Sequence, residues 1–336
     1  GISFFTFGAI SYLMDLYRGH YEAEKNPLNM ALYLSFFPKI SVGPIARYRD
    51  FGPQLTNRQE TVEKTAEGIR RFAYGLGKKV LVANIVGASV DKIYAQDITN
   101  VTGVMVWCAA ILYAIQIYYD FSGFTDMAIG LGKMFGFDIC ENFNYPYLSG
   151  SIQEFWRRWH ISLSSWFRDY LYIPLGGNRK GKARTYLNLA IVFFATGLWH
   201  GAGWNFVLWG MYYFVLLMIE KLFLLRFFEK YPVVGWCFTF PAVVTGWAIF
   251  ASDNLRAVKT YLMQMFGHLS DAGYWTMNLD LLGQTVRQYG IYLVLAFIFS
   301  TAWPYGKYRE NKNRPLTILI FLVLFGLCVY KMQTAA

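Results

Sequence analysis

Long apolar stretches without charge alternate with short charged segments along most of the chain. The longest stretch without Asp, Glu, Lys or Arg is Thr185–Ile219, 35 residues, and as one helix it would measure about 52 Å. That length exceeds a hydrocarbon core of about 30 Å. Gly201-Ala202-Gly203 therefore predicts the turn of a helical hairpin, with arms over residues 186–200 and 204–219.

Other apolar stretches have about the length of one membrane span. Uncharged runs cover residues 98–119, 231–252, 288–306 and 315–330, and weaker candidates cover 3–17 and 72–94. Together with the hairpin, this pattern predicts an all-α polytopic membrane protein with about eight transmembrane helices. No repeat or linker divides the chain, so residues 1–336 are expected to form one domain. The chain starts inside a hydrophobic run, so N-terminal spans of a longer protein are expected to be missing.

Three further segments depart from the pattern of a simple span. Residues 31–46 contain two prolines and Lys39, and residues 121–137 contain several glycines and Asp126, so both are expected to be re-entrant or interfacial. Such backbone persists at membrane depth only when it is buried in protein or lines a wet cavity. Between Glu154 and Tyr172, aromatic residues recur at helical spacing beside charged ones, which predicts one amphipathic interfacial helix.

Composition supports the membrane assignment. Charged residues make up 15% of the chain, against about 25% in ordinary soluble domains, while hydrophobic residues reach 55%. These values exclude intrinsic disorder, a collagen-like chain and a coiled coil. The net charge of +10 is concentrated in loops such as 179–184 and 307–314, which the positive-inside rule places in the cytoplasm. Both chain ends and the loop 253–280 are then predicted outside, and the four separated cysteines form no metal or redox pair.

His200 ends the first arm of the predicted hairpin, about 24 Å from Arg184 if the helix is upright. An ionisable group at that depth is costly unless it faces a cavity or a partner, so a functional role is favoured. A buried neutral imidazole can accept a proton, as a general base for acyl transfer must. The alternative is a structural cap in which His200 bonds a carbonyl of Gly197 or Thr196.

The other titratable residues are less distinctive. His160 would have Arg157 one turn before it and Ser164 one turn after it, but it fits an interfacial aromatic belt equally well. Asp120 and Asp126, six residues apart, would point away from each other on a helix, which favours structural contacts. The chain lacks the motifs of serine hydrolases, nucleotide hydrolases, zinc proteases and dinucleotide-binding folds.

Three motifs resemble the membrane-bound O-acyltransferase family, in the order in which that family carries them: Tyr118–Ala128, Glu154–Leu163 and Gly197–Trp204. The separation of 40 residues between His160 and His200 resembles the two-residue active site of the family. The resemblance implies that His200 is the essential histidine and His160 its partner. It also implies re-entrant and interfacial helices around a central two-sided funnel that meets at the histidine.

Within the family, Asp169–Arg179 resembles the bacterial branch that O-acetylates exported polysaccharides such as alginate. This implies an enzyme of the inner cell membrane, with no bound cofactor, that uses acetyl-CoA or an acyl-carrier thioester as donor. The acceptor would be a hydroxyl of an exported polysaccharide or of a periplasmic relay protein. D-alanyl transfer to teichoic acid is the alternative within the family. A membrane transporter is the alternative of another class, although the hairpin has no second copy in the sequence.

Five residues in or close to the family motifs are expected to contact the substrates: Arg157, Arg158, Asn142, Ser164 and Trp199. Neither a metal ligand nor a nucleic-acid partner is expected.

Overall fold

The computed structural model describes residues 2–95, 101–267 and 315–334, together with individual positions between 283 and 301. Its regular structure is helical, and no strand occurs in that described part of the chain, which agrees with the all-α prediction. Residue contacts divide the chain into two compact units. Unit 1 consists of Gly1–Lys79, Phe121–Asn144 and Trp156–Asn188, and unit 2 consists of Val80–Asp120, Tyr145–Phe155 and Leu189–Ala336. The single-domain organisation stays a prediction.

Unit 1 is built from short and medium helices. They are α1 (Ile2–Tyr17), α2 (Pro27–Ser35), α3 (Phe37–Ile40), α4 (Tyr48–Asn57), α5 (Val62–Gly77), α9 (Ile161–Phe167) and the π-helical turn η4 (Arg168–Tyr172). Its aromatic core packs Tyr33 and Phe36 against Phe51 and Phe137.

Unit 2 contains the longer apolar helices. They are α6 (Asn84–Tyr94), the 3₁₀ turn η3 (Pro146–Leu148), α11 (Trp204–Ile219), the π-helical turn η5 (Glu220–Leu224), α12 (Leu225–Lys230), α13 (Pro232–Ala251), α14 (Leu255–Met265) and α17 (Pro315–Thr334). Four other segments include residues of both units: η1 (Lys78–Ala83), α7 (Gly103–Met134), α8 (Ile152–Arg158) and α10 (Lys182–His200).

Four helical stretches of the described chain are long and apolar enough to cross a membrane: Gly103–Met134, Trp204–Lys230, Pro232–Ala251 and Pro315–Thr334. They correspond to four of the predicted spans. Helix α1 is apolar but shorter, and the predicted spans 72–94 and 186–200 are helical without being among the four. Most of the predicted span 288–306, the loop 307–314, Asp97 and most of the loop 253–280, with His268, lie outside the described residues. The count of eight spans and the orientation therefore stay predictions.

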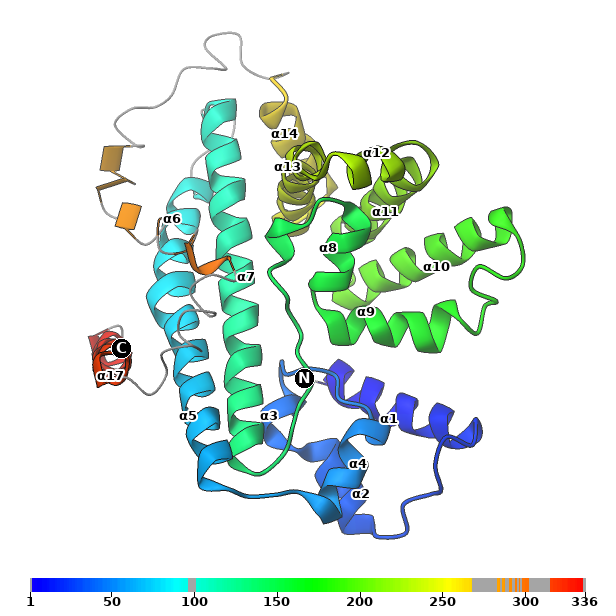
Figure 1. The fold of residues 1–336 in the computed structure, drawn as a ribbon. Coiled ribbons are helices and arrows are strands. Elements are labelled where there is room, and N and C mark those ends of the chain that lie inside the picture. The colour runs from blue at the N-terminus through cyan, green and yellow to red at the C-terminus, as the bar shows by residue number, and fades with distance from the viewer. Residues whose placement is uncertain are drawn as a thin grey trace. The chain divides into compact units, whose positions relative to one another are not determined.

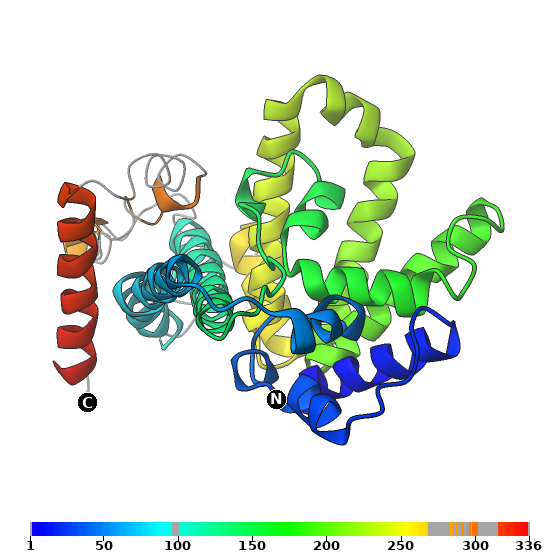
Figure 2. The same cartoon turned by 60° about the horizontal axis from the view of Figure 1, so that its bottom comes forward.

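The expectation of a re-entrant segment over 121–137 is wrong, because α7 continues without a break to Met134. Its glycines are used for helix packing. A Cβ atom on Gly130 would lie 2.6 Å from the carbonyl oxygen of Gly68, and one on Gly123 would lie 2.8 Å from that of Gly75. Helices α5 and α7 therefore meet through their backbones, and they run side by side in both views (Figures 1 and 2). This contact offsets the weak helix propensity of glycine.

Asp126 lies on the same part of α7 and is 4% exposed. Its carboxylate pairs with Arg71 at 2.6 Å and with Lys78 at 2.7 Å. A buried carboxylate requires such partners, because an isolated buried charge is strongly destabilising. The arrangement agrees with the structural role predicted for Asp126.

The single interfacial helix expected over residues 154–172 is also wrong. Helix α8 ends at Arg158 and α9 begins at Ile161, and between them His160 has the left-handed backbone angles φ 44° and ψ 55°. A pattern of side chains at helical spacing continues across this break, which is why periodicity alone did not reveal it. Ser164 consequently lies one turn into α9 and Arg157 lies on α8.

Residues 31–35 belong to α2 and residues 37–40 form the one-turn helix α3, so the re-entrant or interfacial character expected for 31–46 stays a prediction. Polar contacts connect η4 to Arg47, directly after this segment, and to α1. Arg47 pairs with the carboxylate of Asp169, and the Tyr170 hydroxyl donates a hydrogen bond of 2.6 Å to Asp15. Burial raises the pKa of Asp169, but hydrogen bonds from Arg168 and Arg47 outweigh burial and hold that pKa below its usual value.

In unit 2, the chain turns over from α11 through η5 and α12 and returns in α13, which Figure 2 shows as an arch. Glu220 lies at the start of this arch and is fully buried. Its carboxylate accepts the backbone N–H groups of Ile152 at 2.6 Å and Gln153 at 3.1 Å. It thus satisfies donors at the first turn of α8 that have no partner within the helix.

We predict that Gly130→Ala lowers the melting temperature of the detergent-solubilised protein, measured by tryptophan fluorescence. The added methyl group must displace the α5 backbone, a cost of about 1–3 kcal/mol for an overpacked contact. Gly77→Ala on α5 is the matched control, because a Cβ atom there meets nothing within 4 Å. Equal melting temperatures for the two variants would contradict the backbone contact between α5 and α7.

Candidate active site

His200 is the last residue of α10, and α11 begins at Trp204 after the turn Gly201–Gly203. The predicted hairpin turn is therefore confirmed. The alternative in which His200 caps the hairpin is not observed: within the described part of the chain His200 forms no hydrogen bond to Gly197 or Thr196, whose hydroxyl donates to Val192 instead.

The two arms of the hairpin approach each other at glycines. A Cβ atom on Gly197 would lie 2.5 Å from the carbonyl oxygen of Phe206, and one on Gly210 would overlap the carbonyl oxygen of Phe193. Gly197 is one helical turn before His200. The backbone of α10 is thus held against α11 directly beside the histidine.

Aromatic rings surround the His200 imidazole within unit 2. The ring of Trp209 lies 5.0 Å from it between centroids, that of Phe250 5.2 Å and that of Trp199 4.8 Å, all at steep interplanar angles. These rings enclose the imidazole at the carboxyl end of α10. An apolar enclosure favours the neutral imidazole, which is the form that can accept a proton.

His160 lies in unit 1, is 2% exposed and is held by one amide side chain. Oδ1 of Asn142, itself fully buried, lies 3.1 Å from Nδ1 of His160. The same oxygen accepts hydrogen bonds from the backbone N–H of Ser162 at 3.0 Å and from its hydroxyl at 2.9 Å. The carbonyl of Asn142 accepts the N–H of Ile161 at 2.9 Å. These bonds hold the strained backbone at His160 in place.

The same contacts determine the tautomer of His160. A backbone N–H can only donate, so the atom of Asn142 that faces Ser162 must be the oxygen and not the amide nitrogen. An oxygen at that position can only accept from Nδ1 of His160, and Nδ1 must therefore carry the proton. In the neutral imidazole this leaves the lone pair on Nε2. His160 thus has one nitrogen fixed by the protein and one with basic character.

Two phenyl rings pack on the His160 imidazole. Phe121 meets it edge to face, with centroids 4.7 Å apart, and Phe4 stacks at 6.3 Å. Ser162, which the sequence did not single out, connects this group to the irregular segment of unit 1, because its hydroxyl oxygen accepts the N–H of Ile45 at 3.0 Å. Its only sequence signal was its place two residues after His160.

The other predicted site residues are distributed as follows. Asn142 supports His160 through its oxygen, while its buried Nδ2 has no partner among the described residues. Trp199 packs on His200, and the backbone N–H of Ser164 donates to the carbonyl of His160 at 3.0 Å. Arg157 is exposed, and Arg158 bonds Asn144. Their roles toward a substrate stay predictions.

Residues 23–264 match the model of the membrane-bound O-acyltransferase family, and this range includes both histidines. The chain belongs to that family. The earlier resemblance is therefore confirmed. Within the described part of the chain, no group of three or more His, Cys, Asp or Glu side chains is placed to hold a metal ion.

Several curated members of the O-acyltransferase family are similar to this chain. It is 45% identical over 279 residues to the probable alginate O-acetylase AlgI of Pseudomonas fluorescens, covering 83% of this chain and 55% of that protein. It is 36% identical over 297 residues to the peptidoglycan O-acetyltransferase of Helicobacter pylori, with coverages of 79% and 56%. Identity to the teichoic acid D-alanyltransferase of Bacillus subtilis is 30% over 247 residues, with coverages of 69% and 60%. The chain thus spans little more than half the length of these relatives.

We predict that His160→Gly melts at a higher temperature than His160→Ala, because a left-handed backbone costs a residue with a Cβ atom about 1 kcal/mol or more. At Ser164, inside α9, the order should reverse, since glycine is the poorer helix former. Differential scanning fluorimetry of the four variants tests both orders together. If alanine is the more stable substitution at both positions, the left-handed conformation assigned to His160 is incorrect.

Proposed function

We propose that this chain is the catalytic part of a membrane O-acyltransferase, in which His200 is the general base. It transfers an acyl group, acetyl in our proposal, from a cytoplasmic thioester to a hydroxyl of an exported polysaccharide or of an extracytoplasmic relay protein. The observation that carries the proposal is the position of His200 at the carboxyl end of α10, inside a set of aromatic rings. Family membership and the names of the similar proteins support the reaction class.

In the proposed reaction, His200 removes the proton of the acceptor hydroxyl while the oxygen attacks the thioester carbonyl. The new C–O bond forms, the C–S bond breaks, and the proton passes to the leaving thiolate. Positioned general bases contribute about 10²–10⁴-fold to such steps. The rings of Trp209 and Phe250 keep the His200 imidazole in an apolar setting that favours its neutral, proton-accepting form.

His160 is proposed to serve the same transfer as the partner histidine. Nδ1 is bound to Asn142, and we assign the action on the substrates to Nε2, as an acceptor in the neutral ring or as a donor in the protonated one. We place the donor near His160 and near the basic loop 179–184. Arg157 and Arg158, exposed and partly buried respectively, are proposed to contact its phosphates.

The two substrates are proposed to arrive from opposite sides of the membrane. A thioester such as acetyl-CoA carries phosphates that cannot cross hydrocarbon, and an exported glycan does not return. A wet passage from each side must then reach the histidines. In this proposal two substrates meet inside the membrane and form an ester. In a transporter, one substrate would cross the membrane without forming an ester.

Acetyl transfer is favoured over D-alanyl transfer by the degree of similarity. Identity to the alginate O-acetylase of P. fluorescens is 45%, against 30% to the D-alanyltransferase of B. subtilis. The H. pylori relative, also an O-acetyltransferase, is intermediate at 36%. The acceptors named for these relatives are alginate, peptidoglycan and teichoic acid. Each of them is an exported polymer that bears hydroxyl groups.

We predict that His200→Ala lowers ester-linked acetate on exported polymer by about 100-fold or more, the loss expected for a general base. Cells expressing the protein are treated with mild alkali, and the released acetate and D-alanine are measured in the same hydrolysate. Leu187→Ala, at an exposed position of the same helix, is the matched control and should retain activity. Wild-type acetate in His200→Ala would refute the role of His200, and released D-alanine in place of acetate would select the alternative donor.

The same assay separates two roles for His160. His160→Asn should retain more activity than His160→Ala, because an amide tolerates the left-handed backbone and keeps a donor and an acceptor. Equal losses in the two variants would indicate that His160 is itself a base.

We further predict direct transfer without a covalent enzyme intermediate. Purified protein incubated with ¹⁴C-acetyl-CoA, in the absence of acceptor, should carry no label after denaturing gel electrophoresis. Neither histidine has a Cys or Ser nucleophile beside it in a recognisable motif. A stable label that is lost in a Ser or Cys variant would overturn direct transfer.

A further inference from the structure

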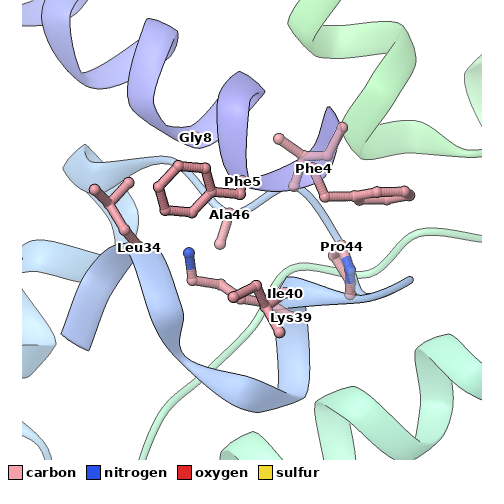
Figure 3. A pocket seen from close by; sticks show the side chains of 9 residues that line it. Phe4, Phe5, Gly8, Leu34, Lys39, Ile40, Pro44 and Ala46 are labelled. Atoms are coloured by element: carbon pink, nitrogen blue, oxygen red, sulfur yellow. The ribbon is translucent and has the colours of Figure 1, made fainter. Parts of the chain in front are cut away.

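Unit 1 contains a pocket that the proposed reaction does not use. Its enclosed part is small, about 10 Å³, and the wider space at its mouth is open to solvent. Its walls come from α1, α2, α3 and the segment before α4, and Figure 3 shows the side chains that line it, among them Phe4, Phe5, Leu34 and Ala46. The walls are apolar except for one residue, Lys39.

The ammonium group of Lys39 is buried in this apolar pocket. The residue is 7% exposed, and Figure 3 shows its nitrogen among Phe5, Leu34 and Ala46. It lies 4.2 Å from the ring centroid of Tyr33 and 5.4 Å from that of Phe51. Within the described part of the chain, no carboxylate pairs with it and no acceptor forms a hydrogen bond to it. A buried ammonium held only by aromatic faces lacks the negative charge that normally accompanies it.

The helices that form the pocket carry exposed apolar side chains. Phe5 on the pocket wall is 39% exposed, Leu32 on α2 is 38% and Phe37 on α3 is 55% exposed. The first two turns of α1, which form part of the wall, belong to an apolar helix. A ligand that enters here would place one negative charge on Lys39 and hydrocarbon on these side chains. A free anion would lose its hydration shell here and gain only one hydrogen-bond donor among apolar walls, so its desolvation would cost more than the contact returns.

We propose that Lys39 binds a phosphodiester oxygen of an anionic phospholipid, whose headgroup lies at the mouth of this pocket and whose acyl chains lie along the exposed side chains of α1 and α2. The bound phosphate supplies the counter-ion that the protein itself does not provide there. Phosphatidylglycerol is the suitable probe, because it carries a single net negative charge.

The site is connected to the surroundings of His160 within unit 1. Phe4 forms part of the pocket wall and stacks on the His160 ring. Ile45 lines the pocket, and its N–H bonds the hydroxyl of Ser162, which in turn bonds Asn142. A lipid at this pocket therefore lies against Phe4, whose ring packs on His160, and against Ile45, whose backbone N–H bonds Ser162.

The test is lipid retention by the purified chain in detergent, measured by native mass spectrometry after exposure to equal amounts of phosphatidylglycerol and phosphatidylcholine. Wild type should retain phosphatidylglycerol preferentially. Lys39→Met should reduce that retention about tenfold, the loss expected when a charge-assisted hydrogen bond is removed. Lys25→Met, at an exposed lysine, is the matched control and should retain the lipid as wild type does. None of these measurements depends on acyl transfer.

Equal retention of both lipids by wild type and Lys39→Met would overturn the proposal, since it would indicate only a non-specific lipid shell. Preferential retention of added oleate, or displacement of the lipid by inorganic phosphate, would overturn it in favour of a fatty acid or a free anion. Lys39→Arg, which keeps the charge, should retain more lipid than Lys39→Met. Should Lys39→Met fail to fold, a photoactivatable phosphatidylglycerol on wild type decides: cross-links to α1–α3 peptides support the site, and their absence refutes it.

Discussion

Much of the environment of His160 depends on one oxygen atom, Oδ1 of Asn142. Three donors converge on it, two from Ser162 and one from the imidazole. Because one of the three is a backbone N–H, the orientation of the amide is determined, and the tautomer of the histidine follows. The left-handed backbone at residue 160 is costly, and it persists here because these bonds and the Asn142 carbonyl hold both sides of the break.

The same principle applies to three buried carboxylates. Asp126 has two cations, Glu220 has two backbone N–H groups and Asp15 has a tyrosine hydroxyl. Each satisfies a charge or an orphan donor that an apolar environment would not tolerate. Among the buried charges described, Lys39 is the exception, because no carboxylate pairs with it.

Local pattern predicted some parts of this chain and not others. The helical class and the hairpin turn followed from run length and from Gly201–Gly203, both of which are local signals. The continuity of α7 did not follow, because the glycines that suggested a break are matched by Gly68 and Gly75, more than 40 residues earlier in the sequence. The break at His160 also depends on a distant residue, Asn142, whose side chain could not be placed from spacing. Family motifs located both histidines, but neither motif nor period could show which nitrogen of His160 carries a proton.

The glycine contacts of the hairpin have a consequence for how the position of His200 changes with sequence. Where helices meet through interlocking side chains, each substitution at the contact moves one helix along or around the other. Here main-chain atoms of Gly197 and Phe206, and of Gly210 and Phe193, determine the separation. The position of the imidazole along α11 is therefore determined by contacts between main-chain atoms of the two helices. Exchange of the surrounding rings would therefore leave the histidine in register along α11.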